Sequence, residues 1–219
     1  MRDKIYPIGL FRNNKSSRKA YLLSLISYLL FAFPLLGHCQ LLDSLSLDTT
    51  RAVTSIKEAI ANPESVIKLD LSKQKLTEVP EDIRKFTNLQ YLDLSKNKIT
   101  VLPKWIGELK NLQFLILSKT KIDSLPPEFG DLTNLKYFIM NRSELQKLPH
   151  TIGKLKELRY MDLWGSNLSY FPYELSYLSD NLRIFLLQDV LISSKLQASL
   201  KAELPNTTIA FTPSCACEQ

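Results

Sequence analysis

The chain has 219 residues, of which 45% are hydrophobic and 23% are charged, with 6 Gly, 11 Pro and 3 Cys. This is the composition of an ordinary globular domain, and it excludes a collagen, a disulfide-built miniprotein and a wholly disordered tail. Because the sequence contains only two His, a His-rich metal cluster is also excluded.

The formal net charge of +6 is concentrated at the N-terminal end. Residues 1–39 carry six basic side chains and one acidic one, whereas the rest of the chain carries 22 basic and 21 acidic side chains. Nucleic-acid binding depends on a broad excess of positive charge that faces the phosphates. The nearly neutral remainder offers no such excess, and we expect no nucleic-acid partner.

Residues 1–39 have the pattern of a secretory signal peptide. A basic stretch runs into an uncharged segment at 20–36, AYLLSLISYLLFAFPLL, which is followed by Gly37, His38 and Cys39. Cleavage after Cys39 places the small residues Gly37 and Cys39 at the two positions that signal peptidase needs, and leaves Gln40 as the new N-terminus. We therefore expect a secreted, periplasmic or cell-surface protein.

Two alternatives for this leader stay open. The apolar segment is only slightly short for a bilayer span, so an uncleaved membrane anchor is one of them. The other is lipidation at Cys39, because residues 36–39 are similar to a bacterial lipobox, although His38 departs from its pattern. In every case residues 41–219 lie outside the cytoplasmic membrane, and contact with a membrane is expected only through the leader or a lipid on Cys39.

Residues 40–65 are interpreted as a linker and an N-terminal capping helix. Val53, Ile56 and Ile60 recur at helical spacing, after candidate N-cap residues at 48–50 and before an Asn-Pro stop at 62–63. The pattern predicts a helix over residues 50–61.

The next part of the chain is an internal repeat. Six segments align with separations of 23, 23, 23, 23 and 24 residues, beginning at Val66, Leu89, Leu112, Leu135, Leu158 and Leu182. The first, fourth, sixth and eleventh positions of the segments are apolar throughout. Such a unit cannot enclose its own apolar side chains, so the repeats must stack and share a common interior.

These segments carry the pattern L-x-x-L-x-L-x-x-N-x-L followed by a Leu-Pro step, whose prolines are Pro80, Pro103, Pro126, Pro149 and Pro172. Over residues 66 to 205 the chain resembles the leucine-rich repeat family, with the repeats at 66–192. The resemblance implies an α/β solenoid, a right-handed horseshoe with a parallel concave sheet. It also implies short helical or 3₁₀ segments on the outer side.

The ninth position departs from the family pattern. The family has Asn there, whose amide bonds the neighbouring backbone, but only Asn97 fits; the other residues are Gln74, Thr120, Ser143, Ser166 and Val190. Gln, Thr and Ser bond backbone groups less uniformly than Asn does. We therefore expect a looser inner turn than in an ideal array.

Residues 193–219 are interpreted as a C-terminal cap and tail. Ser193 or Ser194 is expected to cap a helix that carries Leu196, Leu200 and Leu204, and residues 204–211 are expected to include a final edge strand. Near the end, Cys215 and Cys217 form a C-x-C pair, which we interpret as a tail disulfide in preference to half of a metal site.

No catalytic constellation is present in the sequence. It has no Gly-rich phosphate loop, no H-E-x-x-H and no G-x-S-x-G, and the one His after the leader, His150, follows a Leu-Pro step. Asp70 and Asp93 are paired in adjacent strands, but solvated acids of this kind are common in such arrays. We expect no enzymatic activity, no metal and no cofactor.

The strand residues that point away from the interior form the candidate binding site. Equal positions of neighbouring strands form continuous columns, since strands in a sheet are about 4.8 Å apart. The third column contains four consecutive aromatic residues, and the fifth turns apolar in the middle. With one tryptophan at the seventh position, these columns give the predicted partner-binding residues Tyr91, Phe114, Ile116, Tyr137, Ile139, Tyr160, Trp164 and Leu186.

Aromatic and aliphatic anchors on one face are typical of a protein-binding hot spot, so we expect a protein partner, with Tyr137 and Trp164 as the central contacts. The purely structural interpretation is that the aromatic column only stabilises the sheet. The functional alternative is glycan or cell-wall binding, in which rings lie flat beneath sugars. Ring orientation separates the two functions, because rings that stack on one another are not available as flat platforms.

A second feature is a row of basic residues along one margin of the repeats, Lys73, Lys75, Lys96, Lys98, Lys119, Lys121 and Arg142. Such a row is able to guide an acidic partner or lipid headgroups. More often it is a solvated edge that resists aggregation.

Overall fold

The structure is a computed structural model that describes residues 41–212 and divides the chain into two units, Met1–Thr50 and Arg51–Gln219. In the first unit the described residues form the short helix α2 (Ser44–Thr49), which begins after Asp43, whose carboxylate accepts a hydrogen bond of 2.7 Å from the Ser46 N–H. None of the helices described is both long and apolar enough to cross a bilayer. The predicted leader and the Cys215 and Cys217 pair lie outside the described residues.

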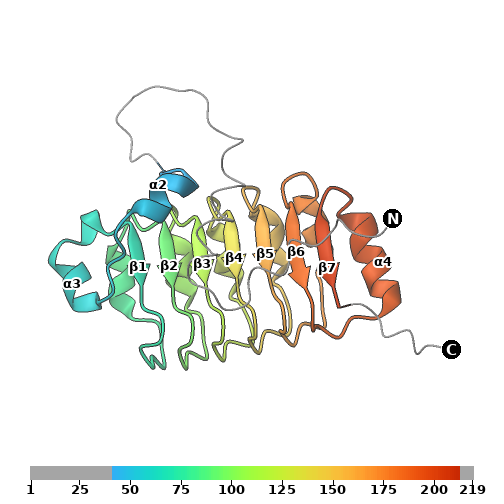
Figure 1. Ribbon diagram of the computed structural model, residues 1–219, viewed down its shortest axis with the longest axis horizontal. Helices are drawn as coiled ribbons and strands as arrows, with labels where there is room; N and C mark the ends of the chain where they lie inside the picture. The colour runs from blue at the N-terminus through green and yellow to red at the C-terminus, as the bar shows by residue number, and fades with distance from the viewer. Residues whose placement is uncertain (1–40, 213–219) are drawn as a thin grey trace, which may run out of the picture. The chain divides into compact units, whose positions relative to one another are not determined.

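The second unit is built on one sheet of seven parallel strands whose order in space follows their order in the chain (Figure 1). Consecutive repeats pair in register, so that Tyr91 lies opposite Phe114 and Phe114 opposite Tyr137. The strands are β1 (Lys68–Asp70), β2 (Tyr91–Asp93), β3 (Phe114–Ile116), β4 (Tyr137–Ile139), β5 (Tyr160–Asp162), β6 (Ile184–Leu187) and β7 (Thr208–Phe211). The predicted parallel solenoid is confirmed.

A 3₁₀ helix follows each Leu-Pro step and connects one strand to the next. Proline suits the position before these helices, because its φ is fixed and the segment requires no amide hydrogen there. They are η3 (Glu81–Lys85), η4 (Lys104–Glu108), η5 (Pro127–Asp131), η6 (His150–Lys154) and η7 (Tyr173–Leu178).

The core lies between the strands and these outer helices. The middle residue of each of the strands β1 to β5 is buried, and the two flanking residues of β1 to β4 are half-buried on the opposite face of the sheet. Most side chains of the four predicted apolar columns are fully buried; Leu76 and Ile192, in the first and last repeats, are only half-buried. The outer wall is closed by side chains with no exposed surface, including Ile83, Ile106, Phe129, Ile152 and Leu175.

Every repeat leaves its strand through the same left-handed turn. The eighth position has φ between 51° and 63° in all six repeats, at Lys73, Lys96, Lys119, Arg142, Gly165 and Asp189. Only one of these residues is glycine, so in the other five repeats the chain accepts the steric cost of a positive φ, about 1 kcal/mol each. Cross-repeat hydrogen bonds, such as that of 2.8 Å from the Lys96 N–H to the Ser118 carbonyl, offset this cost.

The ninth position shows the expected loss of uniformity. Asn97 bonds the backbone of its own repeat and of the preceding one. Thr120 and Ser143 reach only the carbonyl three residues earlier, and the buried Ser166 hydroxyl has no hydrogen-bond partner among the described residues.

The N-terminal cap differs from the prediction. The predicted helix over 50–61 is wrong at its first half: α3 spans only Ile56–Ala61, and the 3₁₀ turn η2 (Pro63–Ser65) follows. Val53 is not helical but forms a parallel bridge with Leu69 of β1. The physical reason is that the exposed edge of β1 offers unpaired backbone groups, and pairing with them stabilises an extended segment more than the helical spacing does.

The C-terminal cap agrees with the prediction. Helix α4 (Ser194–Glu203) begins after Ser193, whose hydroxyl accepts a hydrogen bond from the Leu196 N–H. Leu200 and Leu204 are buried, and β7 pairs with β6 as the last strand of the sheet.

Candidate interaction surface

The predicted site residues lie on one face of the sheet, which we call the strand face. It consists of the strand side chains that point away from the core, and all eight predicted residues are half-buried there or at the strand ends. The third-position rings form one column over β2 to β5, and Ile116 lies opposite Ile139 in the column beside it. Leu186 of β6 lies opposite Asp162 of β5. The sheet register therefore brings the predicted set together.

The aromatic column is a continuous series of ring contacts. The rings of Phe114 and Tyr137 are stacked, with centroids 4.2 Å apart and an interplanar angle of 8°. Tyr91 and Tyr160 continue the series at 5.8 Å and 6.2 Å, with tilts of 34° and 37°. Because the central rings cover one another, they are not flat platforms for sugar rings. The ladder both stabilises the sheet and orders the surface.

Trp164 is held in place at the end of β5. Its indole N–H donates a hydrogen bond of 2.7 Å to the Asp189 carboxylate, and the Arg142 guanidinium lies 4.2 Å from the centre of its ring. A large aromatic side chain fixed in this way loses little conformational entropy when a partner binds.

The fifth-position carboxylates on the strand face are part of the turns. Each accepts a hydrogen bond of 2.8 to 3.0 Å from the backbone N–H two residues later, in the pairs Asp70 and Ser72, Asp93 and Ser95, and Asp162 and Trp164. Asp162 also accepts one of 2.8 Å from the Asn141 amide. Their regular use in the turns gives these acids a structural role.

Burial shifts the pKa values of this face. It raises the pKa of the Asp93 and Asp162 carboxyls above the ordinary 3.8, although the hydrogen bonds they accept act in the opposite direction. Burial, and after it the charge of Asp162, also raises the pKa of the Tyr160 phenol far above its ordinary 10.0. The Tyr160 hydroxyl is therefore neutral and able to donate a hydrogen bond at all physiological pH values.

A pH dependence of stability follows from these carboxyls. Their pKa is higher in the folded than in the unfolded chain, so the stability they contribute is present below 3.8 and is lost as the pH rises through the folded value. Asp162→Asn removes the charge, and rotation of the Asn141 amide restores the side-chain hydrogen bond. We expect the variant to be at least as stable as the wild type at neutral pH, with a shallower fall above pH 3.8, as measured by urea unfolding between acidic and neutral pH. An equally steep fall in the variant would contradict this.

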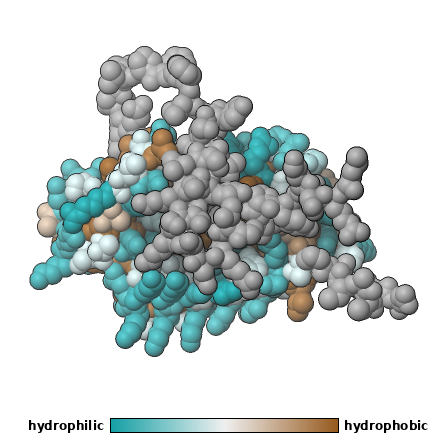
Figure 2. Space-filling view, in the orientation of Figure 1, coloured by the Kyte–Doolittle hydropathy of each residue, from teal (hydrophilic) through white to brown (hydrophobic). Residues whose placement is uncertain are grey.

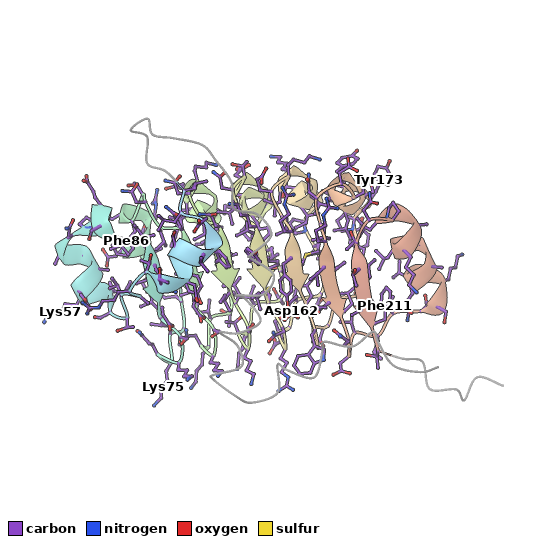
Figure 3. All side chains as sticks on the ribbon, turned by 45° about the horizontal axis from the view of Figure 1, so that its top comes forward. Lys57, Lys75, Phe86, Asp162, Tyr173 and Phe211 are labelled. Carbon is purple, nitrogen blue, oxygen red and sulfur yellow. The ribbon has the colours of Figure 1, made fainter. Side chains whose placement is uncertain are left out.

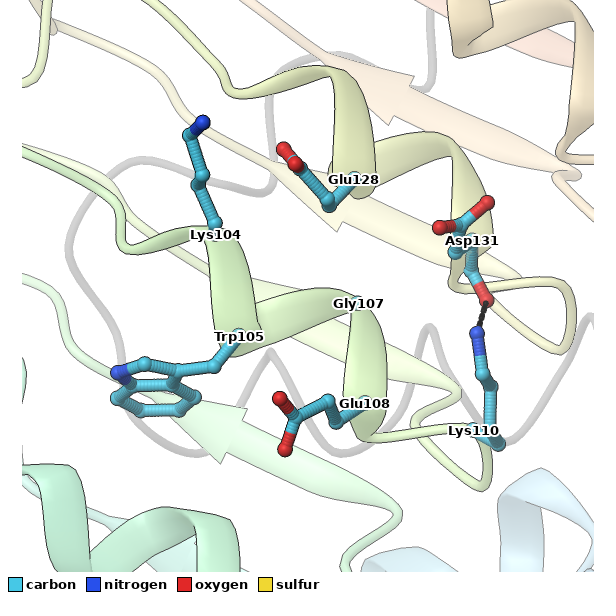
Figure 4. Close-up of a pocket in the computed structure, with 7 residues that line it drawn as sticks. All are labelled: Lys104, Trp105, Gly107, Glu108, Lys110, Glu128 and Asp131. Atoms are coloured by element: carbon cyan, nitrogen blue, oxygen red, sulfur yellow. Dashed lines mark hydrogen bonds between the residues drawn. The ribbon is translucent and has the colours of Figure 1, made fainter.

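The outer helices enclose two shallow hollows that hold none of the predicted site residues. The hollow of about 330 Å³ between η4 and η5 is lined by charged side chains of both signs around Trp105, and the Lys110 ammonium donates to the Asp131 carbonyl at its edge (Figure 4). The other, of about 370 Å³, lies between η6 and η7, where the His150 ring contacts the Glu174 carboxylate at 2.8 Å. Among residues 41–212 no group of three or more His, Cys, Asp or Glu is placed to hold a metal ion.

Three exposed tyrosines of the fifth repeat were not among the predicted site residues. Tyr170, Tyr173 and Tyr177 expose 48%, 69% and 51% of their surface, and Figure 3 shows Tyr173 at the opposite margin of the sheet from Lys75. Comparing equal positions of the repeats would have indicated one of them. Where this repeat has Tyr177, the other repeats have charged residues, namely Lys85, Glu108, Asp131 and Lys154.

A family model described as a leucine-rich repeat region matches residues 64–206, which is more than half of the chain. The chain belongs to the leucine-rich repeat family. Leucine-rich repeat domains generally act as protein-binding modules rather than enzymes, and they bind through the extended surface that the stacked repeats create. No curated protein sequence is significantly similar to this chain.

Several solved structures are similar to this chain. A leucine-rich repeat protein of Leptospira interrogans is 28% identical, with a TM-score of 0.57 over 75% of this chain and 49% of its own. Internalin C2 of Listeria monocytogenes is 23% identical, with a TM-score of 0.48 over 70% of this chain and 55% of its own. The BIR3–SERK2 complex of Arabidopsis thaliana gives 25% identity and a TM-score of 0.47, over 70% of this chain and 74% of that one. The chain thus spans about half the length of the two bacterial proteins.

Proposed function

We propose that this leucine-rich repeat domain is an exported binding module whose strand face, the concave side of the solenoid, binds a protein partner. The observation that carries the proposal is the convergence of Phe114, Ile116, Tyr137 and Ile139 on adjacent strands in register. Apolar side chains gain little from standing half in water, and a rigid group of them is the usual centre of a protein interface.

The geometry suits protein recognition in two further ways. The stacked Phe114 and Tyr137 rings and the anchored Trp164 are fixed before binding, which lowers the entropy lost when a complex forms. Polar groups surround the apolar centre, including the Asp93 and Asp162 carboxylates and the neutral Tyr160 hydroxyl. This arrangement of anchors with a polar rim is the general anatomy of a specific interface. The leader pattern of residues 1–39 supports export.

The test is a crosslinking pull-down from the native host with the full chain, comparing the wild type with the double variant Tyr137→Ala and Trp164→Ala. We expect the double variant to lose the captured partner, because both anchors are removed; affinity losses at such anchors reach about a hundredfold or more. The same preparation gives the intact mass of the exported bait. We expect it to begin at Gln40.

The matched control is the double variant Tyr173→Ala and Tyr177→Ala. It removes two aromatic rings from the outer helix η7, where both are exposed, and should leave capture unchanged. Thermal unfolding by circular dichroism verifies that both double variants are folded. Equal capture by the wild type and the Tyr137 and Trp164 variant would overturn the proposal.

A further inference from the structure

Six lysines project from the turns of the first three repeats, two from each repeat. We call them the lysine ridge, and they are Lys73, Lys75, Lys96, Lys98, Lys119 and Lys121. All six side chains are exposed. They follow the carboxyl ends of β1, β2 and β3, and Figure 2 shows hydrophilic side chains in a row along the margin below these strands. Figure 3 shows Lys75 at this margin.

Backbone hydrogen bonds between repeats hold the turns that carry the ridge. The first lysine of each pair has a left-handed φ, of 62°, 58° and 57° in the three repeats. Its N–H donates to the next repeat, as from Lys73 to the Ser95 carbonyl at 3.0 Å. In the second and third repeats the second lysine bonds back to the previous repeat, as from Lys98 to the Leu76 carbonyl at 2.7 Å, whereas Lys75 in the first repeat has a left-handed φ of 60°. Equivalent lysines are therefore separated by about the strand spacing of 4.8 Å.

Among residues 41–212 the ridge takes part in no ion pair, although the Asp93 carboxylate at the end of β2 acts electrostatically on Lys96. The ion pairs lie instead beside α3, on the outer 3₁₀ helices and in the segments that follow them, as between Arg84 and Glu108 at 3.0 Å. Six like charges at such spacing repel one another, and the stacked repeats hold them together without an ion pair.

The ridge ends after the third repeat. At its two positions the fourth repeat has Arg142 and Glu144, the fifth Gly165 and Asn167, and the sixth Asp189 and Leu191. In addition, Arg142 is engaged with the Trp164 ring. The positive charge is thus a local patch at one end of the solenoid. If the lysines served only to keep the protein soluble, we would expect them in the turns of all six repeats.

We infer that the lysine ridge binds an anionic lipid surface. The ridge contains no aromatic or aliphatic anchor, since the ninth position between the two lysines turns inward or is polar, as with Asn97, Thr120 and Gln74. Protein interfaces depend on buried anchors and are depleted in lysine, while arginine is favoured for specific bidentate contacts. Flexible ammonium groups in an array suit a plane of phosphates, where each contributes independently.

This surface is compatible with the proposed function but does not rest on it. The ridge lies at the carboxyl ends of the strands, whereas the aromatic column lies on their face, so that a membrane at the ridge leaves Tyr137 accessible. The margin that carries the lysine ridge would then contact the membrane, and the strand face would be roughly perpendicular to the membrane plane.

The test is cosedimentation of the full chain with phosphatidylcholine vesicles that either contain or lack phosphatidylglycerol. We expect the wild type to bind more strongly when phosphatidylglycerol is present. The variant Lys96→Gln, Lys98→Gln, Lys119→Gln and Lys121→Gln should lose that difference, with its partition onto the anionic vesicles reduced about a hundredfold or more. Added salt should weaken wild-type binding, because the contact is electrostatic.

The matched control changes the charge by the same amount elsewhere: Lys57→Gln, Lys104→Gln, Lys154→Gln and Lys195→Gln, all exposed on helices, should bind like the wild type. Arginine at the four ridge positions should preserve binding. Equal binding to both kinds of vesicle, unchanged binding of the ridge variant, or loss with arginine would each overturn the inference. Wild-type binding to duplex DNA without binding to anionic vesicles would also overturn it, in favour of a nucleic-acid surface.

Discussion

Asn97→Ala is expected to lower the free energy of unfolding by about 3 to 4 kcal/mol, because it removes the partner of four backbone groups at once. The Asn97 amide nitrogen donates to the carbonyls of Leu71 and Leu94 at 2.9 and 2.8 Å, and its oxygen accepts from the N–H groups of Gln74 and Leu76, both at 3.0 Å. Asn97 is 5% exposed, so water does not readily replace these bonds. Alanine at this position leaves the four backbone groups without these hydrogen bonds. It also removes the side-chain hydrogen bonds that link the turns of the first two repeats.

Urea unfolding followed by circular dichroism measures this loss, and Ser166→Ala is its control. Ser166 occupies the same position three repeats later, is 4% exposed, and its hydroxyl has no hydrogen-bond partner among the described residues. Removing an unsatisfied buried hydroxyl should leave stability unchanged or slightly higher. Equal losses in the two variants would show that the side-chain hydrogen bonds of Asn97 are not what stabilises the turn.

Gly130→Ala is expected to cost about 3 kcal/mol, for a steric reason. Gly130 lies in η5, where a Cβ atom would clash with both the carbonyl oxygen and the Cβ of Thr151 in η6, at separations much shorter than van der Waals contact. The Thr151 oxygen belongs to the backbone and cannot rotate away. The two outer helices must therefore separate, and separation opens the wall that Phe129 and Ile152 close.

The thermal unfolding midpoint checks this expectation against Gly165→Ala. Gly165 has φ of 63°, but the nearest atom to an added Cβ there would be the Arg142 Cγ, at 3.4 Å, and the Arg142 backbone lies at an ordinary contact distance of 3.9 Å. The cost is then only that of the left-handed conformation, about 1 kcal/mol, which the other repeats accept with Lys, Arg or Asp. If Gly165→Ala proved more destabilising than Gly130→Ala, close helix packing would not be the reason for glycine in the outer helices.

The sequence predicted which residues of the candidate site lie in the same column, but it did not predict the contacts between their side chains. Equal spacing of 23 residues is enough to place Phe114 beside Tyr137, since parallel strands of identical repeats pair in register. The spacing does not determine that these two rings stack while their neighbours tilt, or that Trp164 binds Asp189 in the next repeat. Those contacts depend on side-chain rotamers, which neighbouring side chains select.

The N-terminal cap shows the same division. Val53, Ile56 and Ile60 have helical spacing, yet Val53 pairs with the sheet edge and only the residues from Ile56 onward form α3. The spacing of apolar residues within one segment carries no information about an open strand edge nearby. A prediction from that spacing therefore overestimates the length of the helix.

By itself, the sequence determined the repeat length, the inward apolar columns, the common face of the aromatic residues and the absence of a recognisable catalytic motif, because each follows from residue type and spacing. The tertiary structure alone decided which carboxylates are buried and bonded to turns, which ninth-position side chains reach a neighbouring repeat, and which lysines of the described residues form no ion pair. These properties depend on distances between residues of different repeats, and those distances are set only when the repeats stack in the folded protein.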